Sequence, residues 1–148
     1  MLKVGLGMGS ELYSINTQIM EVQRVMGSYS LQISNHRENV GRLEEASNQL
    51  NITKSDFHES EGKCAKPEFT AQVLYGSHER DLTSFRENTL KPGFSAIPDV
   101  QITGAVNQIQ EKIDLLQTEI GRLESSITSL RSQESSLIAR KGEVQNQT

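Results

Sequence analysis

Residues 113–130 of this 148-residue chain read IDLLQTEIGRLESSITSL, and their apolar side chains recur in steps of three and four. Three isoleucines stand seven residues apart, and each is followed three residues later by a leucine, which gives the pairs Ile113/Leu116, Ile120/Leu123 and Ile127/Leu130. This alternation places all six side chains on one face of an α-helix, as at the a and d positions of a coiled-coil heptad. The stretch therefore predicts a long helix that packs against another helix along a narrow seam.

The same spacing extends over both ends of the chain. Between residues 102 and 144, eleven of the thirteen positions at this spacing are apolar, and between residues 12 and 50 ten of twelve are. We predict one long helix over residues 10–53 and another over 102–144, about 65 and 60 Å long at 1.5 Å per residue. Seam positions of the first helix include Ile19, Val22, Met26 and Tyr29. Together with the six seam residues of the second helix, these four are our candidate partner-binding residues.

Polar residues and glycines interrupt this regularity in two ways. His36, Ser47, Glu134 and Lys141 occupy seam positions. Fraying of the seam at a solvated end would explain Glu134 and Lys141, and so would a third long helix from a partner. Gly27, Gly41 and Gly121 each follow an a position, where glycine costs about 1 kcal/mol relative to alanine. Close approach of another backbone would explain these glycines, as would tolerated drift.

The middle of the chain, residues 54–101, breaks the pattern and holds all three prolines. We interpret 54–66 as a loop or frayed helix end, 77–89 as a short helix stopped by the turn signal Lys91-Pro92-Gly93, and 94–100 as an irregular lead. No stretch indicates a strand. The predicted fold is therefore all-α, with two long antiparallel helices in a coiled-coil-like hairpin and a short helix near the bend. We expect a single elongated domain over residues 1–148.

A possible turn motif lies between the long helices. Gly76 follows the bulky residues Leu74 and Tyr75, and Leu82 and Phe85 are spaced along the helix expected next. Glycine at such a junction permits a tight turn or a positive φ. We therefore expect these five residues to shape the end of the hairpin.

Composition excludes several classes of function. Fifteen Lys and Arg against 19 Asp and Glu give a net charge of −4, which argues against nucleic acid or an anionic membrane surface as the main partner. A single Cys excludes a disulfide framework within the chain. No apolar run approaches the length of roughly 18 residues that a membrane span needs. We expect a soluble cytoplasmic protein.

Candidate chemistry is sparse. Gly5-x-Gly7-x-Gly9 has no room before it for the strand that a dinucleotide-binding loop requires. His58, Glu59 and Glu61, with Cys64 nearby, fall in the expected polar loop, which offers no rigid scaffold for a metal. We therefore expect no catalytic residue, no cofactor and no metal site, and we interpret the protein as a binding protein that is not an enzyme.

The layout of a long heptad helix, a bulky-x-Gly turn and a second heptad helix resembles the WXG superfamily of small helical proteins of the type VII (ESX-type) secretion system. Leu74 takes the Trp position of that pattern, Gly76 the Gly, and Leu82 the apolar residue that follows. The chain is more similar still to the YwqH-like helical proteins that accompany LXG-domain toxins. The closer match is carried by RLEEASNQL (42–50), the stretch 67–88 and IQEKIDLLQTEI (109–120).

This resemblance implies a role as chaperone or targeting partner for the helical N-terminal domain of an LXG toxin, and leaves room for a further small helical protein. It also implies a cytoplasmic protein that type VII export could carry with its partner. The chain has no Trp, and no Tyr-x-x-x-acid signal follows the second helix. The alternative from a different class is a homo-oligomeric coiled-coil scaffold or tether with parallel helices.

Overall fold

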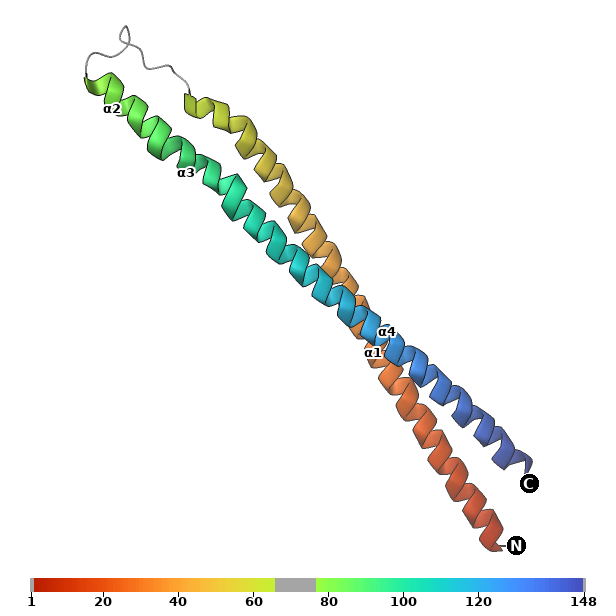
Figure 1. Cartoon of the computed structure of the whole chain (residues 1–148). Coiled ribbons are helices and arrows are strands. Elements are labelled where there is room, and N and C mark those ends of the chain that lie inside the picture. The colour runs from red at the N-terminus through yellow and green to blue at the C-terminus, as the bar shows by residue number, and fades with distance from the viewer. Residues whose placement is uncertain (1, 66–76, 148) are drawn as a thin grey trace. The chain divides into compact units, whose positions relative to one another are not determined.

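The computed structural model describes residues 2–65 and 77–147, and nearly all of them are helical. The order is α1 (Leu2–Glu61), a 3-10 turn η1 (Gly62–Ala65), α2 (Ser77–Phe85), a π-helical turn η2 (Arg86–Leu90), α3 (Lys91–Ala96), a second π-helical turn η3 (Ile97–Ile102) and α4 (Thr103–Asn146) (Figure 1). No strand occurs in the described ranges. The predicted all-α class is thus confirmed, and α1 and α4 pack against each other as a helical hairpin.

The chain divides into two compact units, which we describe separately. The hairpin unit comprises Met1–Val40 and Leu115–Thr148, so it holds the first part of α1 and the larger part of α4. The proline unit comprises Gly41–Asp114, with the rest of α1 and the helical turns that lead into α4. The prediction of a single domain stays a prediction.

Two ion pairs show the relative direction of α1 and α4 in the hairpin unit. Near the start of α1, Glu11 Oε1 lies 3.1 Å from Arg140 Nη2 of α4. Further along α1, Arg37 Nη2 lies 2.6 Å from Glu124 Oε1. Because residue numbers rise along α1 while those of their partners fall, the helices are antiparallel here, as Figure 1 also shows.

The core of the hairpin unit is the seam that the heptads predict. Ile33, Ile120, Leu123 and Ile127 form its buried cluster, and Met26, Tyr29 and Val40 pack against that cluster. Leu123 is 0% exposed. Burying one such aliphatic side chain contributes about 1.5–3 kcal/mol, whereas an exposed ion pair contributes about 0–1 kcal/mol. The seam therefore dominates the stability of this unit, and the ion pairs at its edges help to fix direction and register.

The polar residues at seam positions are also where the spacing puts them. His36, Glu134 and Lys141 are half-buried in the hairpin unit, and Ser47 is half-buried in the proline unit. Neighbouring positions that the heptad assigns to the outside, such as Arg37 and Ser135, are exposed. The register predicted from the sequence is therefore correct even where the seam residue is polar.

In the proline unit, Figure 1 shows the second part of α1 running antiparallel to the helical path from α2 to the start of α4, and two side-chain contacts join them. The rings of Phe57 and Phe94 have centroids 5.4 Å apart. One residue further along α1, His58 Nε2 lies 3.6 Å from Asp99 Oδ1 of η3. Ile102 and Ile113 are buried on the same path.

The bounds of the first long helix differ from the predicted 10–53. The helix α1 begins at Leu2 and ends at Glu61, so it includes both the expected N-terminal lead and much of the expected loop. No proline interrupts this range, and each residue added to an existing helix gains a hydrogen bond for fixing one residue only, without the cost of a new nucleus. At the far end, the Phe57–Phe94 contact supplies apolar packing that the sequence pattern does not reveal.

The predicted turn at Lys91-Pro92-Gly93 is wrong. From Ser77 to Asn146 the chain stays helical, and residues 94–100 are helical as well. Pro92 and Pro98 lie in the first turns of α3 and η3, where the helical hydrogen-bond pattern changes between α and π and the missing backbone N–H is tolerated. The π-helical turns absorb additional residues, because their wider hydrogen bonding lengthens a turn. That lengthening shifts the three–four spacing, which is why the pattern fails to predict a helix here.

Candidate partner-binding surface

The residues predicted to bind a partner lie in the seam between the chain's own helices. In the hairpin unit, Val22, Leu116, Ile120, Leu123 and Ile127 are buried, while Ile19, Met26, Tyr29 and Leu130 are half-buried. In the proline unit, Ile113 is buried. Their side chains serve first to hold the protein together. Their contact with a partner stays a prediction.

The predicted turn motif is described only in part. Leu74, Tyr75 and Gly76 lie outside the described residues. Leu82 and Phe85 lie on α2, as expected, and both side chains are exposed. Their role at the end of the hairpin stays a prediction.

A groove opens beside the seam of the hairpin unit, with a volume of about 410 Å³. We assign heptad letters so that Ile33 and Ile127 are a positions. The groove is then lined only by a, b and e positions of α1 and α4: Ser30, Ile33, Ser34, Arg37, Glu124, Ile127, Thr128 and Arg131. Ile33 and Ile127 lie in its floor, and the serine and threonine side chains of its walls are short. We call the side formed by the b and e positions the groove face.

The charges of the groove do not cancel. Arg37 and Glu124 pair across it at 2.6 Å. Thr128 Oγ1 donates to the backbone carbonyl of Glu124 at 3.1 Å, so that hydroxyl is used within α4. Arg131 makes no ion pair with any carboxylate in the described part of the chain. With two arginines and one glutamate, the groove carries a net charge of about +1 at neutral pH.

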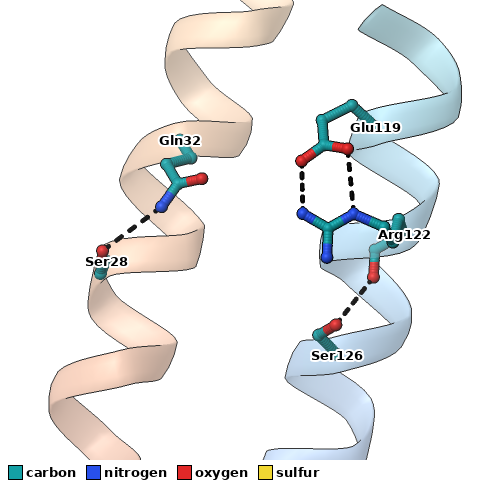
Figure 2. Close-up of polar contacts among 5 residues, drawn as sticks. All are labelled: Ser28, Gln32, Glu119, Arg122 and Ser126. Atoms are coloured by element: carbon teal, nitrogen blue, oxygen red, sulfur yellow. Dashed lines mark hydrogen bonds and ion pairs between the residues drawn. The ribbon is translucent and has the colours of Figure 1, made fainter. Parts of the chain in front are cut away.

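The other side of the hairpin unit, formed by its c and g positions, is different. Figure 2 shows Arg122 Nε donating to Glu119 Oε2 at 2.9 Å and Ser126 Oγ donating to the Arg122 carbonyl at 3.0 Å. On α1, Gln32 Nε2 lies 3.5 Å from Ser28 Oγ. The hydrogen bond from Arg122 holds the pKa of Glu119 below its usual value, with a smaller contribution from the charge of Arg122. This side satisfies much of its polarity internally.

Large apolar side chains remain outside the seam. In the hairpin unit, Tyr13, Met20 and Ile138 are 75%, 69% and 52% exposed. By the heptad register, Tyr13 and Met20 are b positions and Ile138 is an e position, so all three belong to the groove face. Leu31 and Leu115 are also exposed, at f and c positions. Sequence reasoning missed this surface because it followed only the seam, although the heptad letters of these residues were available.

The described residues of the proline unit include a smaller pocket of about 150 Å³ beside Phe57 and Phe94 and exposed apolar side chains such as Ile52 and Val100. His58 Nδ1 lies 3.3 Å from Glu61 Oε1, and its other ring nitrogen faces Asp99. His58 and Glu61 stand in the last turn of α1, so of the two interpretations of this stretch, a loop or a helix end, the loop is wrong for them. The ranges 2–65 and 77–147 contain no cluster of three or more His, Cys, Asp or Glu suited to hold a metal ion. Within the same ranges, no helix has the length and apolar content needed to cross a membrane.

Fold and surface together define a class of small helical-hairpin proteins whose two helices share a heptad seam. The sequence model of the YwqH-like family matches residues 17–145, which cover most of α1 and nearly all of α4. The chain therefore belongs to the YwqH-like family. No curated protein and no solved structure matches it.

Proposed function

We propose that this protein is a non-catalytic helical partner, acting as chaperone or targeting factor, for an LXG-type toxin of a type VII secretion system. Membership of the YwqH-like family supports this proposal. So does the resemblance to the WXG superfamily of the layout with two long heptad helices and a bulky-x-Gly segment between them. The partner would be the helical N-terminal domain of the toxin, with room for a further small helical protein. The complex would form in the cytoplasm, and type VII export could carry both proteins.

The observation that carries the proposal is the exposure of large apolar side chains on a hairpin whose seam is already closed. Tyr13, Met20 and Ile138 are not needed to fill the core, because the cluster around Leu123 does so without them. Exposed apolar side chains commonly mark a protein-binding surface when they gather in one patch, and the heptad register places these three on one side of the hairpin unit. A helix of the toxin would bury these side chains together with its own apolar face.

The seam residues fit this mechanism as supports of the binding surface. Ile127 has its side chain in the seam and also contributes to the groove floor. A partner helix in the groove would therefore touch the edge of the seam without opening it. Such binding needs no nucleophile, general base or cofactor, so the proposed role is binding without catalysis.

Co-expression tests the proposal. The full chain and the N-terminal domain of the LXG toxin from the same genome would be produced together, and the purified material examined by size-exclusion chromatography with light scattering. We expect one peak that contains both chains, with a mass equal to a whole-number combination of the two. A homodimer of this chain that elutes apart from the toxin domain would contradict the proposal and favour a homo-oligomeric scaffold.

A further inference from the structure

We propose that the groove face of the hairpin unit binds a single amphipathic helix of the partner, which presents small or aliphatic residues to the groove floor and a carboxylate to Arg131. This inference rests on the proposed function and names the surface and the chemistry through which the partner is held. Tyr13, Met20 and Ile138 extend the contact beyond the groove.

The shape of the groove allows a helix to approach its floor. Ser30, Ser34 and Thr128 keep the walls of the groove low, so a helix backbone can approach the floor formed by Ile33 and Ile127. Contact of this kind resembles the packing of one helix into the groove between two others. The groove runs between two antiparallel helices over residues 30–37 and 124–131, and a single helix is the occupant that fits a surface of this kind.

Glycines lie along the groove face at positions where the hairpin itself does not need them. Gly27, Gly121 and Gly142 all fall at b positions of the hairpin unit, on the groove face, and a Cβ added at any of them meets nothing within 4 Å. The chain's own packing therefore does not require glycine there, although each costs about 1 kcal/mol of helix stability relative to alanine. A backbone from another molecule passing close to the groove face accounts for all three positions.

The positive charge of Arg131 in the groove favours a partner that brings a carboxylate. Arg37 is neutralised by Glu124 across the groove, whereas Arg131 has no carboxylate partner among the described residues. A carboxylate on the bound helix would complete the pairing and fix its position along the groove. A second copy of this chain would bring the same positive groove, so two copies placed face to face would repel each other.

The side of the hairpin unit formed by its c and g positions differs from the groove face. The c and g positions hold pairs such as Glu119–Arg122 (Figure 2) and Glu11–Arg140, which satisfy one another. Their hydrogen bonds would have to be covered or broken by a partner, and covering them gains little. Among the residues whose side chains are described, Leu115 is the large apolar residue exposed on that side. The groove face also holds one such pair, Arg37–Glu124, but it presents Tyr13, Met20 and Ile138 and thus offers a partner more apolar surface.

The test compares matched variants of the full chain in titrations with the co-expressed toxin domain, purified and recombined. Thr128→Trp fills the groove, while Ser129→Trp, one residue further along α4, places the same ring on the c side. We expect Thr128→Trp to weaken binding by at least about tenfold, since overpacking a contact costs 1–3 kcal/mol, and Ser129→Trp to bind within about twofold of the wild type. Equal losses in both variants, or a larger loss in Ser129→Trp, would overturn the proposal.

Two further variants separate binding from folding. Gly121→Leu should raise the thermal midpoint of the free protein and yet weaken binding, because the new side chain meets open space until the partner arrives. Arg131→Glu should weaken binding at least about tenfold, while Arg131→Lys keeps most of it, since like charges brought together are strongly unfavourable. Binding unchanged by both Gly121→Leu and Arg131→Glu would refute the assigned face.

The outcomes distinguish this inference from the function on which it rests. If the wild-type chain does not bind the toxin domain at all, the proposed function and the inference both fail. If the wild type binds and the groove-face variants bind equally well, only the inference fails. A doubling of the mass of the free wild-type chain that Thr128→Trp abolishes would show that a second copy occupies the face, and would also overturn the inference.

Discussion

The replacement of Leu123 by alanine probes the seam where it is most completely buried. Leu123 is 0% exposed and lies in the cluster with Ile33, Ile120 and Ile127. The change removes three carbon atoms, at about 0.8 kcal/mol each, or roughly 2.4 kcal/mol of lost burial. A cavity term adds to this value, but the open groove beside Ile127 lets neighbouring side chains relax. We therefore expect a loss of about 3 kcal/mol, in the lower part of the range for Leu→Ala.

The assay is urea denaturation followed by circular dichroism at 222 nm, with Leu115→Ala as the matched control. Leu115 is 65% exposed on the same helix, so its truncation should cost less than about 0.5 kcal/mol. In thermal melts, the loss at Leu123 should lower the midpoint by roughly 6–12 °C. If both variants lose the same small amount, the seam does not hold the hairpin unit together, and the packing argument is refuted.

Three further predictions concern other parts of the chain. Gly121→Ala should raise the free energy of unfolding by about 1 kcal/mol, measured by urea denaturation, because the added methyl group meets open space and alanine favours the helix. Glu119 has a lowered pKa in the folded state, so its contribution is present above its unfolded pKa and is lost as the pH falls through the folded pKa. Glu119→Gln should therefore lose less stability than the wild type when denaturation is repeated from about pH 6 to about pH 3; equal losses would contradict the role of this carboxylate. Phe57→Leu keeps apolar burial but loses the ring contact with Phe94, and should cost about 0.5–1.5 kcal/mol by the same assay.

The sequence predicts the seams well because their physical signal is local and repeated. Each a and d residue is spaced from the next by a single helical turn, so the register can be read without knowledge of the partner helix. Even His36 and Lys141, which are polar, lie half-buried where the spacing places them. The antiparallel hairpin is predicted from two long helices of matched length in one chain, and the Arg37–Glu124 and Glu11–Arg140 pairs agree with it.

The middle of the chain was less predictable, because the effect of a proline depends on the hydrogen bonds around it. Pro92 and Pro98 end a helix when they fall in its interior, but in the first turn of a helical segment they are tolerated. Pro92 follows the π-helical turn η2 and Pro98 stands in the first turn of η3, so each falls where the hydrogen-bond pattern changes, and the residue that a π-helical turn adds erases the three–four spacing. No local pattern distinguishes this arrangement from a turn.

The binding surface could be predicted only in part. The heptad letters alone place Tyr13, Met20 and Gly121 at b positions, which is enough to predict that they lie outside the seam. Whether the groove beside the seam stays open depends on the sizes of side chains from two distant segments, 30–37 and 124–131, and on which of their charges pair. That information exists only once the two helices are brought together.

The groove face is left for a partner only if α1 and α4 close their seam within one chain. Spin labels at Arg37→Cys and Glu124→Cys, in a Cys64→Ser background, report this directly when measured by pulsed electron resonance. We predict a single short distance that persists when the labelled protein is refolded with an excess of unlabelled protein, since Arg37 and Glu124 pair within one chain. Loss of that distance on dilution would show that the helices pair between chains, which contradicts the hairpin and supports a homo-oligomeric coiled coil.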